Sequence, residues 1–171
     1  VDHGKTTLVD GLLKQSHTFR DNQAEMQQTL IMDSMDQEHE RGITITAKQT
    51  CVYYDGYKIN IIDTPGYLDF VGEVKQATRV ADSAIIVVDG KAGIEVGTEI
   101  GWNLATEAGI PKAFFINRFD DGEARFYKVF GAIREKYGLT VCPIQIPIID
   151  GDTVIGFANL VEMCVYTFEK Q

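Results

Sequence analysis

Two short apolar runs, residues 84–89 and 113–117, most restrict the folds open to this chain. Each run is apolar along nearly its whole length, which is the pattern of a strand buried on both faces of a sheet. The stretch between them, from about Glu95 to Ala108, has the spacing of an amphipathic helix. Because parallel strands need a crossover connection, this order predicts an α/β fold with a mostly parallel central sheet.

Helix and strand patterns continue on both sides of this unit. A tight hairpin is predicted where two strand-like runs flank the pair Asp55-Gly56. Residues 18–41 are polar, lack periodicity and are expected to form a long mobile loop. The two hairpin strands are residues 50–54 and 57–63, and the further helix patterns are residues 8–13, 70–80 and 125–137. These elements predict a three-layer fold, with the first strand of its sheet missing before residue 1.

The pattern changes after Gly138. Short apolar runs then alternate with turns, including one at residues 150–152, as in a segment built from hairpins. We therefore expect two parts, a main α/β domain over residues 1–138 and the beginning of a smaller α+β subdomain over residues 139–171.

Composition limits the class of protein further. With 44% hydrophobic and 24% charged residues, the chain can build a globular core. It has no stretch of the about 18 apolar residues that a membrane span needs and no secretion leader, so we expect a cytoplasmic protein. Its 16 basic and 25 acidic residues give a net charge of −9, which disfavours broad binding to nucleic acid. The three cysteines and three histidines lack ligand-like spacing, which argues against a zinc site.

The first residues carry a phosphate-binding pattern. Gly4-Lys5-Thr6 matches the end of the loop G-x-x-x-x-G-K-[ST], whose first glycine would lie two residues before Val1. In such a loop, main-chain N–H groups point at phosphate oxygens, the lysine reaches the β and γ groups, and the hydroxyl binds Mg²⁺. The alternative is an ordinary helix start with an exposed lysine.

Two further polar turns follow predicted strands. At residues 63–66 (Asp-Thr-Pro-Gly), the aspartate can hold Mg²⁺ and the Gly66 N–H can bond a γ-phosphate. At residues 117–120 (Asn-Arg-Phe-Asp), Asp120 can accept hydrogen bonds from N1 and N2 of guanine, a donor pair that adenine lacks. Either sequence is also an ordinary turn. Because all three loops lie at strand ends or a helix start, their combination favours one site for a guanine nucleotide with Mg²⁺.

These motifs together resemble the guanine-nucleotide motifs of the translational GTPases. The similar segments are residues 2–7 (Asp-His-Gly-Lys-Thr-Thr), 41–45 (Arg-Gly-Ile-Thr-Ile) and 63–66, and Asn117 with Asp120. The segment 41–45 is especially specific to that superfamily. Residues 32–48 are also similar to the TypA or BipA family, but residues 126–135 and 141–148 resemble the elongation factor G family, which carries an inserted subdomain. The later half therefore favours the elongation factor G family.

The resemblance implies a role for each motif. The catalytic residues would be Lys5, Gly66 and Tyr67, with Tyr67 positioning the attacking water. The Mg²⁺ ligands would be Thr6, Thr44 and Asp63, with Thr44 closing on the γ-phosphate as part of switch I. The residues binding GTP or GDP would be Asp2, His3, Gly4, Lys5, Thr6, Thr7, Thr44, Asp63, Gly66, Asn117, Arg118 and Asp120. His3, otherwise an ordinary exposed histidine, has no catalytic role in this scheme.

Two residues depart from the family's pattern. Tyr67 stands where most members carry the histidine that helps to orient the attacking water, and a phenol cannot carry a positive charge near pH 7. The hypothesis is slower or differently triggered hydrolysis. Arg118 stands where the family has lysine, and its stem and planar head can stack on guanine, although the two side chains are not interchangeable. We expect guanine selectivity to survive through Asp120, with reduced affinity.

The resemblance also implies a cellular role. The expected partners are a guanine nucleotide and the ribosome at its large-subunit GTPase-activating region, with no membrane and no direct sequence-specific binding to nucleic acid. GTP hydrolysis would be coupled to ribosomal translocation. The alternatives are a ribosomal protection or TypA/BipA-like GTPase, and a GTP-switched binding module with little hydrolysis. Within a P-loop NTPase fold, residues 1–138 would be a partial GTP-binding domain and residues 139–171 the beginning of the inserted subdomain.

Overall fold

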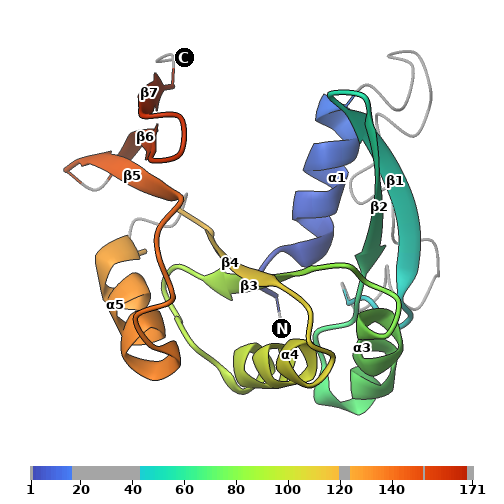
Figure 1. Ribbon diagram of the computed structural model, residues 1–171. Coiled ribbons are helices and arrows are strands. Elements are labelled where there is room, and N and C mark those ends of the chain that lie inside the picture. The colour runs from blue at the N-terminus through green and yellow to red at the C-terminus, as the bar shows by residue number, and fades with distance from the viewer. Residues whose placement is uncertain (1, 17–42, 120–123, 152, 169–171) are drawn as a thin grey trace. The chain divides into compact units, whose positions relative to one another are not determined.

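The computed structural model describes residues 2–16, 43–119, 124–151 and 153–168. Helices and strands alternate along much of the chain (Figure 1). In order they are α1 (Lys5–Gln15), β1 (Lys48–Tyr54), β2 (Tyr57–Asp63), the 3-10 helix η2 (Leu68–Phe70), α3 (Val71–Thr78), β3 (Ala84–Asp89), α4 (Val96–Glu107), β4 (Lys112–Asn117), α5 (Phe126–Tyr137), β5 (Gln145–Asp150), β6 (Thr153–Asn159) and β7 (Cys164–Thr167). The predicted loop at residues 18–41 lies outside the described residues. The other predicted helices and strands are confirmed, with bounds that differ by a few residues.

The chain divides into two compact units. Unit 1 comprises Val1–Ile86 and Gly97–Ala113, and unit 2 comprises Val87–Val96 and Phe114–Gln171. Each unit contains one end of β3 and one end of β4. These units differ from the predicted domains, residues 1–138 and 139–171, which rest on a change of sequence pattern. The predicted domain division stays a prediction.

In unit 1, β1 and β2 form the predicted antiparallel hairpin, with Tyr54 opposite Tyr57. The two turn residues between them, Asp55 and Gly56, both have positive φ, at 48° and 77°. A two-residue turn of this kind matches the right-handed twist of the flanking strands, which is why an Asp-Gly pair predicts a hairpin. The second strand ends at Asp63.

A small apolar core joins α1 to this hairpin. Val9 and Leu13, one turn apart on α1, are buried together with Val52 of β1, and Ile61 of β2 packs against them. Residues four apart lie on the same face of a helix, so the predicted apolar face of α1 is the face that meets the hairpin. This packing sets where the first turn of α1 lies relative to the end of β2.

β3 and β4 form a parallel pair. The Ala84 N–H donates to the Pro111 carbonyl at 2.9 Å, and the Gly90 N–H donates to the Asn117 carbonyl at 2.8 Å. The acceptor lies 27 residues after the donor at both ends (111 − 84 and 117 − 90), as parallel pairing requires. α4 provides the crossover between the strands, so the predicted crossover unit is confirmed.

The apolar runs also predict strands buried on both faces, and this prediction is wrong for parts of β3 and β4. Ile86 and Val88 are buried, but Ile85 is 62% exposed and Phe115 is 38% exposed. Successive strand residues point to opposite faces, so one face of β3 is packed and the other is partly open. Among the described residues, β3 and β4 form a sheet of two strands only, apart from β1–β2 and β5–β6–β7.

Unit 2 contains α5 and the predicted hairpin-rich segment. Phe126, Val129 and Ile133 are buried, which confirms the predicted apolar face of α5. β5, β6 and β7 form an antiparallel sheet, with an irregular register between Ile148 and Ile149. These three strands account for the change of sequence pattern after residue 138.

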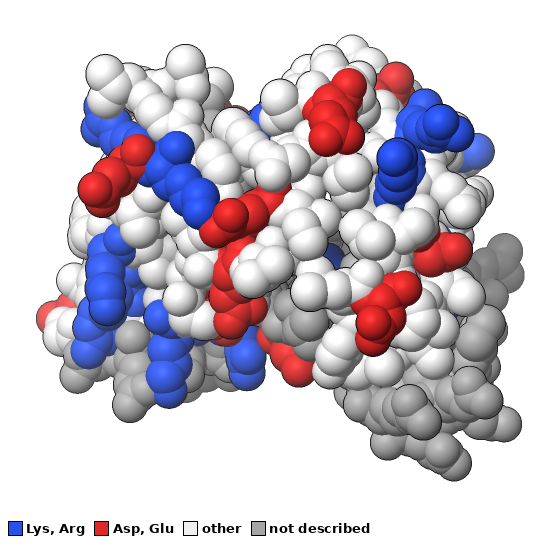
Figure 2. Space-filling model, turned by 90° about the horizontal axis from the view of Figure 1, so that it is seen from below, with Lys and Arg blue, Asp and Glu red and all other residues white. Residues whose placement is uncertain are grey.

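The surface carries charges of both signs. On the face shown in Figure 2, lysine and arginine side chains occur beside aspartate and glutamate side chains. This face is therefore not uniformly acidic, despite the net charge of −9. Among the helices that the structure describes, none combines the length and the apolar character of a membrane span.

Candidate functional site

Three predicted metal ligands meet at the first turn of α1. The Thr6 hydroxyl donates a hydrogen bond to Asp63 Oδ2 at 2.7 Å and lies 3.0 Å from the Thr44 hydroxyl. Asp63 ends β2 and is only 3% exposed. Thr44 precedes β1, so the three oxygens come from three separate parts of unit 1. Hydroxyl and carboxylate oxygens are ligands that Mg²⁺ accepts, so this donor set fits the ion.

The start of α1 provides main-chain donors beside these oxygens. Gly4 has a left-handed conformation, with φ at 84°, and no side chain caps the helix. The first N–H groups of a helix have no partner within it, and together with the helix dipole they favour a bound anion. The Gly4 carbonyl accepts the Leu8 N–H at 2.9 Å, so the helix begins within the predicted phosphate motif, directly after Gly4.

Lys5 is held in a partly desolvated position. Burial lowers the pKa of its ammonium group below the ordinary lysine value, while the carboxylates of Asp63 and Asp2 act in the opposite direction. A nearby negative charge stabilises the ammonium form of such a lysine and so opposes the effect of burial on its pKa. The environment of Lys5 therefore suits a phosphate group.

The other residues of the predicted phosphate loop differ in exposure. Asp2 and Thr7 are exposed. His3 is only 7% exposed, so the alternative of an ordinary exposed histidine does not hold. His3 lies immediately before α1, and the sequence around it contains no signal for its burial.

The segment after β2 contains the predicted switch residues. Gly66 is half-buried, and Tyr67 is 37% exposed with an extended backbone at the start of η2. The Ala47 N–H, three residues after Thr44, donates to the Glu73 carboxylate of α3 at 2.9 Å. This hydrogen bond links the Thr44 segment to the helix that follows Gly66 and Tyr67.

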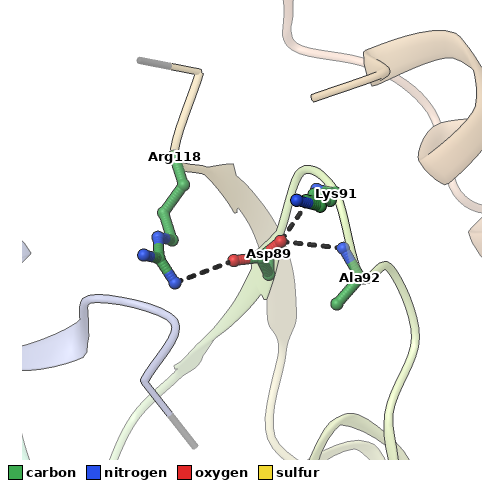
Figure 3. A network of polar contacts seen from close by, with 4 residues as sticks. All are labelled: Asp89, Lys91, Ala92 and Arg118. Atoms are coloured by element: carbon green, nitrogen blue, oxygen red, sulfur yellow. Dashed lines mark hydrogen bonds and ion pairs between the residues drawn. The ribbon is translucent and has the colours of Figure 1, made fainter. Parts of the chain in front are cut away.

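The predicted base-binding turn lies in unit 2. Asn117 ends β4, and Arg118 has a left-handed backbone with φ at 65°. The Arg118 guanidinium pairs with Asp89 Oδ2 at 3.3 Å (Figure 3). Asp89 is a partner that sequence reasoning missed. The available signal was an aspartate at the end of an apolar strand, next to the strand that ends at Asn117.

The structure brings one group of the predicted site residues together within unit 1. Lys5, Thr6, Thr44 and Asp63 come together in unit 1, whereas Asn117 and Arg118 belong to unit 2. Asp120 lies outside the described residues. One site that joins the phosphate residues to Asp120 therefore stays a prediction.

A family model, curated proteins and a solved structure all show similarity to this chain. A family model described as the elongation factor Tu GTP binding domain matches residues 1–170. Elongation factor G from two strains of Dehalococcoides mccartyi is 38% identical over 173 residues, which cover 99% of this chain and 24% of each relative. The chain thus spans about a quarter of the length of these curated relatives. A crystal structure of a protein from Thermus thermophilus matches with a TM-score of 0.88 and 28% identity, over 98% of this chain and 25% of that one.

These matches agree with the motifs and the fold. The resemblance to translational GTPases of the elongation factor G type is confirmed, and so is the P-loop GTPase fold class. The family model spans nearly the whole chain, from the phosphate loop to β7. The chain therefore belongs to the family of the elongation factor Tu GTP-binding domain, and it is similar to about a quarter of the length of elongation factor G.

Proposed function

We propose that this chain binds GTP and GDP with Mg²⁺ and that it hydrolyses GTP as part of a translation factor. The observation that carries the proposal is the meeting of Thr6, Thr44 and Asp63 at the start of α1. Thr6 is 38 positions from Thr44 and 57 positions from Asp63, so their contacts are not a consequence of sequence proximity. It supports a site for Mg²⁺ beside a phosphate chain.

Each residue of this group has a distinct task in the proposal. Lys5 and the first N–H groups of α1 bind phosphate oxygens. Thr6, Thr44 and Asp63 hold Mg²⁺, which when bound would neutralise charge on the β- and γ-phosphate oxygens. The Gly66 N–H bonds the γ-phosphate, and the Tyr67 hydroxyl accepts or donates a hydrogen bond to orient the attacking water.

Base selection is assigned to the turn that follows β4. Asp120 accepts hydrogen bonds from N1 and N2 of guanine, and Asn117 supports the same turn. Arg118 lies along the base with its stem and planar head. A nucleotide with adenine lacks the donor pair that Asp120 requires, so selectivity for guanine is expected.

The whole protein is proposed to act on the ribosome. Its similarity to elongation factor G supports coupling of GTP hydrolysis to translocation, with stimulation by the GTPase-activating region of the large subunit. In this scheme the protein is cytoplasmic, residues 1–138 are a partial GTP-binding domain and residues 139–171 begin the inserted subdomain. A ribosomal protection or TypA/BipA-like role remains the alternative within the same chemistry.

Hydrolysis assays on the full-length protein test this function. With ribosomes and Mg²⁺, we expect GTP hydrolysis well above the rate without ribosomes, and an excess of ATP should leave the GTP rate unchanged. Competition by ATP would contradict guanine selectivity. Absence of any ribosome effect, with tight GTP binding retained, would instead support the GTP-switched binding module.

Tyr67 is the residue that favours this second candidate, because it replaces the histidine found in most of the family. A neutral imidazole can accept a proton near pH 7, whereas a phenol cannot. We expect Tyr67→His to raise the ribosome-stimulated rate of GTP hydrolysis by about tenfold, which is less than the usual about 100-fold minimum of acid–base effects because the phenol can already orient the water. The Kd for GDP serves as the control and should stay constant. Equal hydrolysis rates would remove Tyr67 as the limiting feature.

A further inference from the structure

Asp89 holds together the turn after β3 and the turn after β4. Its Oδ1 accepts the Lys91 and Ala92 N–H groups, both at 2.8 Å, and its Oδ2 faces the Arg118 guanidinium at 3.3 Å (Figure 3). The two carboxylate oxygens therefore serve different partners. Asp89 as a whole is 6% exposed, whereas the Arg118 side chain is 52% exposed. The buried carboxylate is a fixed anchor for a side chain that is about half exposed.

The backbone of Arg118 needs such an anchor. Its φ of 65° is unfavourable for a residue with a side chain, and a conformation of this kind persists where surrounding contacts impose it. Such contacts are present on the preceding residue, because the Asn117 carbonyl accepts the Gly90 N–H at 2.8 Å. The Gly90 carbonyl in turn accepts the Arg125 N–H at 2.9 Å. Backbone hydrogen bonds thus hold the start of this turn, and Asp89 holds its exposed side chain.

Gly90 makes the close approach of the two turns possible. A Cβ built at this position would lie 2.8 Å from the Asn117 carbonyl oxygen and 3.1 Å from the Ala124 Cβ. Any larger residue would therefore push the two turns apart. Asp89 and Gly90 together form a fixed support beneath the Asn117–Arg118 turn, and all these residues belong to unit 2.

We propose that Asp89 is a positioning residue for guanine, which rests on the proposed function. By pairing with the guanidinium, Asp89 restricts Arg118 to a small set of rotamers before the nucleotide arrives. A restrained side chain loses less conformational freedom on binding, so the affinity for guanine nucleotides rises. The pairing also offsets the charge of Arg118, so that the side chain acts on the base through its stem and planar face rather than as a free cation.

The substitution Asp89→Asn separates this role from support of the turn. The asparagine side-chain oxygen can still accept the Lys91 and Ala92 N–H groups, but its amide does not attract a guanidinium. In the full-length protein, we expect the Kd for GDP and the KM for GTP to rise about fivefold, the size expected for one partly exposed ion pair. The kcat of ribosome-stimulated hydrolysis should not change. Asp82→Asn, at an exposed aspartate just before β3, removes the same charge and should leave the Kd for GDP unchanged.

A double-mutant cycle with Arg118→Met decides whether Asp89 acts through Arg118. In the Arg118→Met protein, Asp89→Asn should change the Kd for GDP by less than about twofold, because the partner is already absent. An equal fivefold loss in both backgrounds, or a lower kcat at constant KM, would overturn the proposal. If the unchanged protein bound no GDP, the proposed function itself would fail. If the unchanged protein bound GDP and Asp89→Asn had no effect on the Kd, only the proposed role of Asp89 would be contradicted.

Discussion

Replacing Lys5 with alanine in the full-length protein is expected to raise the Kd for GTP and GDP by at least about 100-fold. Lys5 supplies the only charged side chain in the proposed contacts to the β- and γ-phosphates, and hydrogen bonds to charged groups are worth about 1.5–3 kcal/mol each. Equilibrium titration with a fluorescent GDP analogue measures the change. Lys14→Ala, in the last turn of the same helix, is the matched control and should leave the Kd within about twofold.

The same variant separates loss of binding from loss of fold. Because burial lowers the pKa of Lys5 in the folded protein, its ammonium form is disfavoured there relative to the unfolded chain. The ligand-free protein is therefore less stable below the lowered pKa, and its stability rises as the pH passes from that value towards 10.5. We expect Lys5→Ala to retain or raise the thermal midpoint without nucleotide at pH 7. A large fall in that midpoint would contradict the environment described for Lys5.

Nucleotide affinity should follow the protonation of Lys5. Bound phosphate favours the ammonium form, so the pKa of Lys5 is expected to be higher in the complex than in the free protein. The affinity for GDP should then fall as the pH rises above the lowered pKa of the free protein, and Lys5→Ala should lose this dependence. Titrations over a pH series, with Lys5→Ala as reference, would show whether another group is responsible.

Replacing Asp63 with asparagine is expected to lower ribosome-stimulated GTP hydrolysis by at least about 100-fold, comparable to the loss of one preorganised electrostatic contact. In the unchanged protein, the Thr6 hydroxyl donates a hydrogen bond to the Asp63 carboxylate at 2.7 Å. The asparagine amide keeps an oxygen that can accept this hydrogen bond, but it lacks the negative charge that favours Mg²⁺. Single-turnover hydrolysis with ribosomes measures the rate. Asp69→Asn, an exposed aspartate in η2, controls for the charge removed.

A second measurement links the effect of Asp63→Asn to the metal. Mg²⁺ should strengthen GTP binding by the unchanged protein, and this gain should be largely absent in Asp63→Asn. Binding measured in EDTA should be nearly equal in the two proteins, since the phosphate contacts of Lys5 and the α1 N-terminus do not need the ion. If Mg²⁺ strengthened binding equally in both, Asp63 would not belong to the metal site.

Much of the fold is predictable from local sequence. The hairpin follows from Asp55-Gly56, because few residue pairs accept positive φ at both positions. The parallel pair follows from two apolar runs joined by a helix. Burial was less predictable, since the apolar composition of β3 did not reveal that Ile85 lies on a partly open face. A residue's exposure depends on what covers that face, and the covering residues are distant in sequence.

By itself, the sequence of this protein determined the motifs, their order, and the family to which the chain belongs. Only the tertiary structure decided which contacts Thr6 makes with Thr44 and Asp63, that His3 is buried, and that Asp89 holds Arg118. Short motifs depend on neighbouring residues and on backbone conformations that the residue types themselves favour. Contacts across tens of residues depend instead on packing, such as that of α1 on the hairpin, and this packing is a property of the folded chain as a whole.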